Sequence, residues 1–255
     1  MFAGSESHVG MSVIEPLLPN KPRGVPRVDD RRVLNGIFWV LRTGAPWRAL
    51  PKEYGPRTTC YNRFVRWREA GVWDRVLDSV SKAYDGDIQM IDSTSVRVYQ
   101  HVANSKKSDP DRCMGRSRGG LTTKIHCVVD ARGLPLSFHL TPGQAADCPA
   151  ATHLLGHLGH KDILLADKAY DADWLRRKIE DCGAVPNIPN KANRNWKACF
   201  SQTLYRMHNA IERFYSKIKH FRRIATRYEK KGANYLAMVK LASSIVWMRF
   251  YESVT

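Results

Sequence analysis

Apolar residues in the first third of the chain recur every three or four positions, which is the period of a helix that buries one face. Between residues 29 and 44, Val33, Ile37 and Val40 follow this period, and Asp29 and Gly44 suit the start and the end of a helix. Similar segments lie on either side. The helices expected here cover residues 12–19, 29–44 and 57–84, the last with a break at Gly71.

After residue 85 the pattern changes to alternating and short continuous apolar runs, which predict strands. The strands expected are 87–99, two within 124–141 around the turn Asp-Ala-Arg-Gly, 162–167 and 184–189. The helices expected between and after them are 145–160, 171–183, 208–230 and 234–251, and residues 102–123 are expected to form a basic loop. Strands and helices in this order predict a mixed α/β layer fold. We therefore expect a helical domain over residues 1–85 and an α/β domain over residues 86–255.

Charge and composition narrow the class of partner. The chain of 255 residues has a formal net charge of +17 and a pI of about 9.8, and the excess runs along the whole chain. Such an excess favours a nucleic-acid partner, although a basic solvated surface without a partner has the same composition. The six cysteines form no C-x-x-C pair, and neither a signal peptide nor a membrane-spanning run is visible. We expect a cytoplasmic protein that is not associated with a membrane.

One basic segment of the helical domain is a candidate for contact with DNA. Residues 57–68 interleave Arg57, Arg63 and Arg66 with aromatic residues. One face of this helix can pack while the other offers cations to phosphates, as in the second helix of a helix-turn-helix. The alternative is a basic amphipathic helix that only packs.

Three acids on separate elements are candidates for metal binding. Asp92 lies near the end of an expected strand, Asp167 follows the apolar run Ile-Leu-Leu-Ala, and Glu212 lies in the first turns of an expected helix. Acids at strand ends of α/β folds point toward the ligand-binding edge, and Mg²⁺ prefers oxygen ligands. Taken singly, each acid has an ordinary alternative, as a cap or a surface ion pair. Ser93, beside Asp92, is expected to form supporting hydrogen bonds and not to act as a nucleophile.

Residues around Glu212 add to this picture. At about 100° per residue, Tyr205 and Lys219 fall within about 20° of the face of Glu212, and His208 lies near it. A carboxylate for a metal ion with cations beside it for phosphate is a chemically sensible set.

The chain resembles the DDE transposases of bacterial insertion sequences, in the group typified by insertion sequence five within the insertion-sequence-four-like superfamily. The resemblance covers about residues 12–250 and is carried by MIDSTSVR, GRSRGGLTTKIHCVVDARGLPLSFHLTPGQAAD, LLADKAYDAD and YRMHNAIERFYSKIK. The family pattern in the last segment is Tyr, two residues, Arg, three residues, Glu, six residues, Lys. This sequence has Tyr205, Glu212 and Lys219, but His208 replaces the Arg.

The resemblance implies a ribonuclease-H-like mixed-sheet core behind a small helical DNA-binding domain. It also implies a protein of the bacterial cytoplasm that associates with the nucleoid. It implies that Asp92, Asp167 and Glu212 are catalytic and bind Mg²⁺, for which Mn²⁺ can substitute, and that the enzyme cleaves transposon ends and joins them to target double-stranded DNA. Tyr205, His208 and Lys219 would contact the DNA end, with Arg116 and Arg118 on its backbone. His208 is only partly charged at neutral pH and lacks the planar fork of Arg.

Three functions stay open at this stage. The first is a transposase, expected to act as a homodimer on DNA because two ends must be paired. The second is a nuclease of the same fold that does not join DNA. The third is a DNA-binding relic that has lost catalysis.

Overall fold

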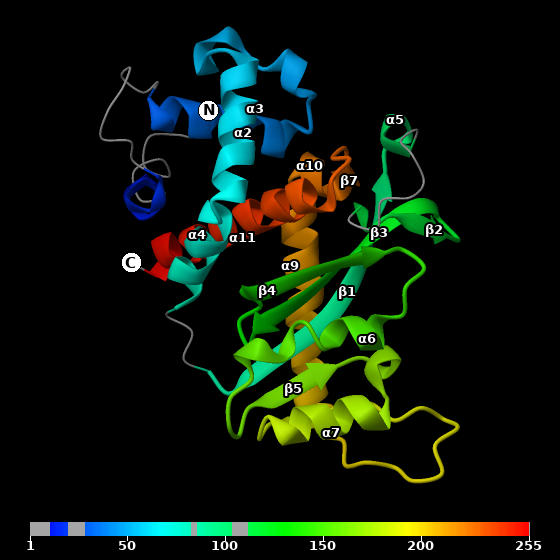
Figure 1. Ribbon diagram of the computed structural model, residues 1–255. Coiled ribbons are helices and arrows are strands. Elements are labelled where there is room, and N and C mark those ends of the chain that lie inside the picture. Colours follow the sequence, from blue (N-terminus) through cyan, green and yellow to red (C-terminus); the bar gives the residue numbers. More distant parts are fainter. Residues whose placement is uncertain (1–10, 20–28, 83–85, 104–111, 255) are drawn as a thin grey trace. The chain divides into compact units, whose positions relative to one another are not determined.

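The computed structural model describes residues 11–19, 29–82, 86–103 and 112–254, and it divides the chain into two compact units. The first unit combines residues 1–82, 99–111 and 218–255, and the second combines residues 83–98 and 112–217. Figure 1 shows the elements of both. Within the described residues, no helix is long and apolar enough to cross a bilayer.

The first unit is helical. Its N-terminal part contains η1 (Glu15–Leu17), α2 (Asp30–Thr43), η2 (Trp47–Ala49), η3 (Lys52–Tyr54), α3 (Arg57–Glu69) and α4 (Val72–Ser81). The Asp29 side chain accepts a hydrogen bond from the backbone N–H of Arg31, and Gly44 ends α2 in the left-handed region with φ 71°. Gly71, with φ 65°, separates α3 from α4. The caps and the break expected from the sequence are confirmed.

The C-terminal helices belong to this same unit. It contains α5 (Gln100–Ala103), α10 (Arg222–Ala225), the short β7 (Thr226–Arg227) and α11 (Gly232–Val254). The hydroxyl of Tyr251 in α11 donates to the carbonyl of Val80 in α4 over 2.6 Å, and Trp247 is fully buried. Residues 218–255 therefore pack with the N-terminal helices in one unit. The boundary between a DNA-binding and a catalytic region near residue 85 stays a prediction.

The second unit is built on a mixed sheet. Its strands are β1 (Ile88–Val98), β2 (Gly115–Ser117), β3 (Gly120–Asp130), β4 (Pro135–Pro142), β5 (Ile163–Ala166) and β6 (Val185–Asn187). The central order is β4-β3-β1-β5-β6, in which β4, β3 and β1 are antiparallel and β1, β5 and β6 are parallel. The mixed α/β fold expected from the sequence is confirmed.

Helices and 3₁₀ turns of this unit lie along the sheet, and Figure 1 shows α9 running across the strands. They are α6 (Asp147–Ala151), η5 (Leu155–His157), η6 (Lys168–Tyr170), α7 (Asp173–Asp181), α8 (Gln202–Tyr205), η7 (Arg206–His208) and α9 (Asn209–Lys219). Phe214 of α9 contacts Phe138 of β4 with ring centroids 6.0 Å apart. This face of the sheet is therefore covered by the helix that carries Glu212.

Three expectations about single elements are wrong. The helix expected over 145–160 ends at Ala151, since Gly156 and Gly159 oppose a longer helix. The described part of the loop expected over 102–123 includes α5 and, from Gly115, a hairpin of β2 and β3, turned where Gly120 has φ 92°; residues 104–111 lie outside the described residues. The helix expected over 208–230 ends at Lys219.

Candidate active site

Asp92 and Asp167 occupy matching positions on neighbouring strands. Strands β1 and β5 are parallel, and their register ends with Ile91 opposite Ala166. Asp92 and Asp167 are the next residues on the two strands, and adjacent strands lie about 4.8 Å apart. The apolar runs that precede the acids are buried, whereas both acids are partly exposed. The strand pairing thus brings the two carboxylates side by side where β5 ends. This point lies midway along β1, so the expectation that Asp92 lies near the end of its strand is wrong.

The environment of Asp92 disfavours its negative charge. Burial raises its pKa to about 6; the backbone N–H of Ser93 and the nearby His208 lower it, and the carboxylates of Asp167 and Asp147 raise it again. The Ser93 N–H donates to Asp92 Oδ1 over 2.7 Å. A group with too little compensation for its charge is typical of functional sites.

The backbone of Asp92 is held from helix α9. The Tyr215 hydroxyl donates toward the carbonyl oxygen of Asp92 at 2.7 Å and lies 3.2 Å from that of Ile125. Opposite Asp92 on β3, Cys127 is fully buried, and burial followed by the charge of Asp92 raises its pKa well above the usual range. The thiol is therefore neutral, and Tyr215 ties the strand of Asp92 to the helix of Glu212.

Asp167 also caps a short turn, as the ordinary interpretation of the sequence allows. Its Oδ1 accepts from the N–H of Ala169 over 2.9 Å at the start of η6. This bond engages one of the two carboxylate oxygens and fixes its direction. A capping role and a ligand role are therefore compatible at this residue.

The charges of all three acids affect the pKa of Tyr205. Burial raises its pKa, followed by the charges of Asp167, Asp92 and Glu212. Its ring stacks on His208, with centroids 5.3 Å apart and an interplanar angle of 17°. Glu212 is exposed in the first turn of α9, and among the described residues no cation forms an ion pair with it. The surface-ion-pair alternative for Glu212 therefore has no support within the described part of the chain.

The single helix face expected for Tyr205, His208, Glu212 and Lys219 does not exist. Tyr205 ends α8, His208 lies in η7, and α9 begins only at Asn209. His208 is 5% exposed, and its Nε2 lies 3.3 Å from the carbonyl oxygen of Ile91. His208 is thus buried and stacked on the ring of Tyr205, and its own contact with DNA stays a prediction.

Lys219 is the last residue of α9 and belongs to the other compact unit. It is half-buried, and burial lowers the pKa of its ammonium group. The helix ends there because tertiary contacts stabilise the turn that follows. Phe221 and Ile224 are buried. The Arg223 side chain donates to Glu229 over 2.7 Å and to the carbonyl of Ala45 over 3.0 Å.

A network around Asp147 adjoins the acid pair, and sequence analysis did not single it out. Asp147 Oδ1 accepts from the Ser93 hydroxyl at 2.8 Å and from Lys124 Nζ at 2.9 Å. His126 Nδ1 lies 3.9 Å from the same oxygen, and burial lowers the pKa of His126 to about 4, so the ring is neutral. Ser93 therefore has the supporting role expected of it, and Lys124 offsets the charge of Asp147. The only available signal was the position of Asp147 at the end of the second quoted motif.

The donor set suits a hard cation. Asp92 and Asp167 offer carboxylate oxygens on neighbouring strands, and a divalent ion would relieve the penalty that burial imposes on Asp92. Within residues 11–19, 29–82, 86–103 and 112–254, no three His, Cys, Asp or Glu side chains are grouped closely enough to hold one ion together. The arrangement is a pair of acids with Glu212 separate from it. The assignment of all three as metal ligands stays a prediction.

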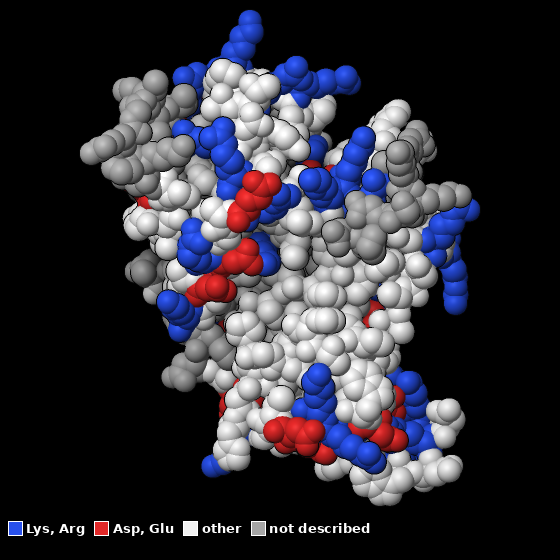
Figure 2. All heavy atoms as spheres, viewed as in Figure 1, with Lys and Arg blue, Asp and Glu red and all other residues white. Residues whose placement is uncertain are grey.

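The arginines proposed to contact DNA differ in their surroundings. Arg57 and Arg66 of α3 are exposed, whereas Arg63 pairs with Asp30 and lies 5.7 Å from the ring of Trp67. Arg116 of β2 and Arg118 in the following turn are both exposed. On the face drawn in Figure 2, Lys and Arg gather over the N-terminal helices and over β2, while both signs of charge mix around α7.

Comparisons with known proteins agree with this architecture. A family model described as "Transposase DDE domain" matches residues 83–247, and one described as "Putative transposase of IS4/5 family" matches residues 11–77. A piggyBac transposase synaptic complex with hairpin DNA, solved by cryo-EM, is similar with a TM-score of 0.53 and 10% sequence identity, over 96% of this chain and 71% of that one. At this identity the likeness concerns the fold alone.

Two curated relatives come from insertion sequences. The "Putative transposase for insertion sequence element IS6501" of Brucella ovis is 42% identical over 51% of this chain and all of its own length. The "Putative transposase for insertion sequence element IS402" of Burkholderia cepacia is 29% identical over 51% of this chain and 64% of its own length. With a matching catalytic-domain model over more than half its length, the chain belongs to the DDE transposases of bacterial insertion sequences, enzymes that cleave and join DNA.

Proposed function

We propose that this transposase binds the two ends of its own insertion sequence, cleaves them and joins them to double-stranded target DNA on the nucleoid, with Asp92, Asp167 and Glu212 as its catalytic acids. The observation that carries the proposal is the parallel register in which Ile91 faces Ala166, because Asp92 and Asp167 directly follow this pair on neighbouring strands. Tyr205 connects Glu212 to this pair, since its pKa is raised by the charges of all three acids after the larger effect of burial.

DDE transposases use divalent metal ions, and Mg²⁺ is the ion proposed here, with Mn²⁺ able to replace it. Asp92 and Asp167 would hold it, with Glu212 contributing a ligand from α9. A bound divalent ion supplies activation of an attacking oxygen and stabilisation of a leaving oxygen in phosphoryl transfer. Asp147 and Lys124 keep Ser93 and the backbone at Asp92 in place. Exposed Arg57, Arg66, Arg116 and Arg118 are proposed to contact phosphates, together with Tyr205 and Lys219 near the DNA end, and salt should weaken that binding steeply.

The test uses a labelled DNA fragment that carries the element's own ends, incubated with Mg²⁺ and the wild-type protein or Glu212→Gln. Cleaved and joined products from the wild type alone support the proposal. Glu180→Gln is a matched control, because Glu180 is an exposed acid on α7 in the same unit. Loss of activity in both variants to the same extent would contradict a special role for Glu212.

Two other outcomes separate the alternatives. Cleaved ends without joined products would identify a nuclease of this fold. Binding without cleavage by any protein would identify a relic, with His208→Arg as the next variant to make, because it restores the family residue.

We further propose a homodimer on DNA, because two ends must meet and each needs one set of acids. Mass measurement of the complex with two labelled ends checks this. A complex that holds both ends with a single copy of the chain would contradict the dimer.

A further inference from the structure

Tyr170 is a buried tyrosine whose hydroxyl has no hydrogen-bond partner among the described residues. It is 1% exposed, at the end of η6, and its phenolic oxygen is also shielded from solvent. The other two buried tyrosines in the described part of the chain each donate to a carbonyl oxygen at 2.7 Å, Tyr215 to that of Asp92 and Tyr235 to that of Ile224. A buried hydroxyl without a partner lowers stability, and a phenylalanine would avoid this cost. The hydroxyl of Tyr170 therefore needs an explanation other than the stability of the fold.

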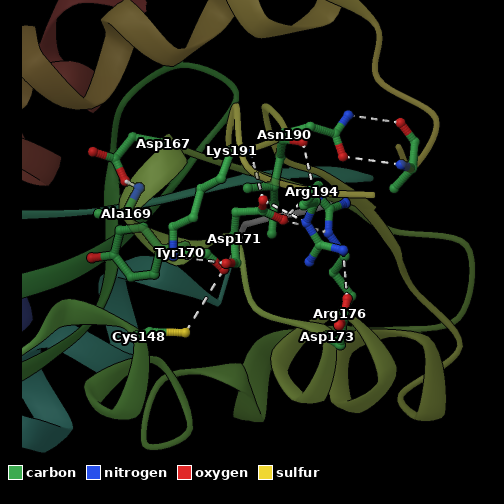
Figure 3. Close-up of polar contacts among 12 residues, drawn as sticks. Cys148, Asp167, Ala169, Tyr170, Asp171, Asp173, Arg176, Asn190, Lys191 and Arg194 are labelled. Carbon is green, nitrogen blue, oxygen red and sulfur yellow. Dashed lines mark hydrogen bonds and ion pairs between the residues drawn. The ribbon is translucent and has the colours of Figure 1, made fainter. Parts of the chain in front are cut away.

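The turn η6 holds Tyr170 close to Asp167. The backbone N–H of Tyr170 donates to the carbonyl of Asp167 at 3.1 Å, and Asp167 Oδ1 accepts from the N–H of Ala169 at 2.9 Å. Figure 3 shows the side chains of Asp167 and Tyr170 extending to the same side, away from the cations gathered at Asp171. Tyr170 therefore belongs with the candidate active site and not with the neighbouring charge network of Asp171.

Tyr170 also contacts α6, the helix that begins at Asp147. Cys148 Sγ lies 3.7 Å from the carbonyl oxygen of Tyr170, and η6 packs against α6. Asp147 in turn accepts from the Ser93 hydroxyl at 2.8 Å, and Ser93 directly follows Asp92 on β1. Tyr170 therefore lies where η6, α6 and the middle of β1 meet.

The electrostatic surroundings of Tyr170 agree with this position. Burial raises its pKa well above the usual range, so the phenol keeps its proton. Three charges add to this effect, those of Asp92, Asp147 and Asp167 in decreasing order. The Ser93 hydroxyl has a smaller, opposite effect on this pKa, but it lies outside hydrogen-bond geometry and its own proton is donated to Asp147. Tyr170 is thus a protonated donor close to carboxylates to which it is not bonded.

We propose that Tyr170 is a positioning residue of the candidate active site, whose hydroxyl donates a hydrogen bond to the Asp92 carboxylate when a divalent cation is bound there. This inference rests on the proposed function. Asp92 Oδ1 already accepts from the N–H of Ser93, and a carboxylate has further lone pairs for a cation and a second donor. Donors to metal-binding carboxylates orient them. Because the bond is absent in the structure, its formation on binding would add to the affinity for the cation.

The experiment compares Tyr170→Phe with the wild type in two measurements that should change in different ways. The midpoint of urea denaturation in EDTA should stay the same or rise, since the variant loses no bond of the metal-free protein. The affinity for Mn²⁺, measured from the electron paramagnetic resonance signal of the free ion, should weaken by about 10- to 100-fold. A tyrosine with a merely structural role would give a lower midpoint and unchanged Mn²⁺ binding.

Tyr235→Phe is the matched control, because it removes a bonded hydroxyl from a buried tyrosine of the first unit. It should lower the midpoint and leave Mn²⁺ binding unchanged. Mn²⁺ binding by Tyr170→Phe equal to that of the wild type would overturn the inference and leave the proposed function intact. A midpoint that falls as far as that of Tyr235→Phe would overturn it too. Wild-type protein that binds Mn²⁺ no more tightly than Asp92→Asn would contradict the proposed metal site itself, and this inference with it.

Discussion

Asp92 and Asp171 are two acids of the same unit with opposite electrostatic surroundings. Asp171 is buried and bonded to Arg176, Arg194 and Lys191; burial alone raises its pKa, but these bonds outweigh burial and hold the pKa below its usual range. Asp92 has no such partners among the described residues, and burial raises its pKa to about 6. The fold compensates the charge of Asp171, whereas the described residues leave the burial penalty of Asp92 largely uncompensated. This contrast supports the proposal that Asp92 binds a cation.

The largest effect that tests this contrast between the two acids is expected for the replacement Asp92→Asn. Under the proposed role of Asp92 as a metal ligand, its loss removes several kcal/mol of transition-state stabilisation, so strand cleavage should fall by about 10³-fold or more. Single-turnover cleavage of a labelled end measures it. DNA binding in EDTA should remain, and activity within tenfold of the wild type would remove Asp92 from the catalytic set.

Asp171→Asn should damage stability first. The change leaves Arg176 and Arg194 without their charge partner, and breaking a buried ion pair costs about 3–5 kcal/mol. Urea denaturation with a fixed slope measures the loss of unfolding free energy. Asp173→Asn is the control, since it removes an exposed partner of the same Arg194 and should cost less than about 1 kcal/mol. Equal losses of unfolding free energy in the two variants would show that the buried bonds of Asp171 add no more stability than the exposed ion pair of Asp173.

The pH dependence of stability should have opposite signs at the two acids. The raised pKa of Asp92 means that the folded state binds its proton more tightly than the unfolded state, so this residue destabilises the fold above pH 6 and the penalty disappears as the pH falls toward 4. Asp92→Asn should therefore stabilise the metal-free protein by about 1–3 kcal/mol at pH 7 and by little at pH 4.

The lowered pKa of Asp171 gives the reverse behaviour, because its contribution is present above its unfolded value near pH 4 and is lost as the pH falls further. Denaturation curves from pH 7 to pH 3 measure both effects. A stability advantage of Asp92→Asn that does not change with pH would contradict the electrostatic explanation.

The smallest effect expected is that of Tyr215→Phe, which removes the hydroxyl bonded to the Asp92 carbonyl. Stability should fall by about 1 kcal/mol, and cleavage should fall because the strand of Asp92 loses a support. Tyr251→Phe removes a comparable bond to Val80 in the other unit and should change stability without changing cleavage. If both variants keep full activity, Tyr215 only supports the fold.

The sequence correctly predicted those elements that are set by residues close together in the chain. Asp29 and Gly44 cap a helix by their own chemistry, and Asp167 was singled out because it directly follows a short apolar strand. Asp92 was singled out as an acid near a strand end, although it lies midway along β1. The helix expected over 208–230 was wrong because Arg223 finds partners far away in sequence, at Gly44 and Ala45. The Asp147 network and the bonds of Lys191 and Arg194 to Asp171 also join distant segments, and no periodicity records such pairings.

The first unit is discontinuous, and this has a consequence for how the chain is made. Its N-terminal helices and α11 are separated by the whole mixed sheet, so α4 meets its partner only after residue 251 has left the ribosome. At about 5–20 residues per second, synthesis of the intervening segment takes on the order of 10–30 seconds. During that interval the nascent N-terminal helices lack the helix that covers Val80. The order of synthesis therefore delays completion of this unit until the three proposed catalytic acids have already been translated.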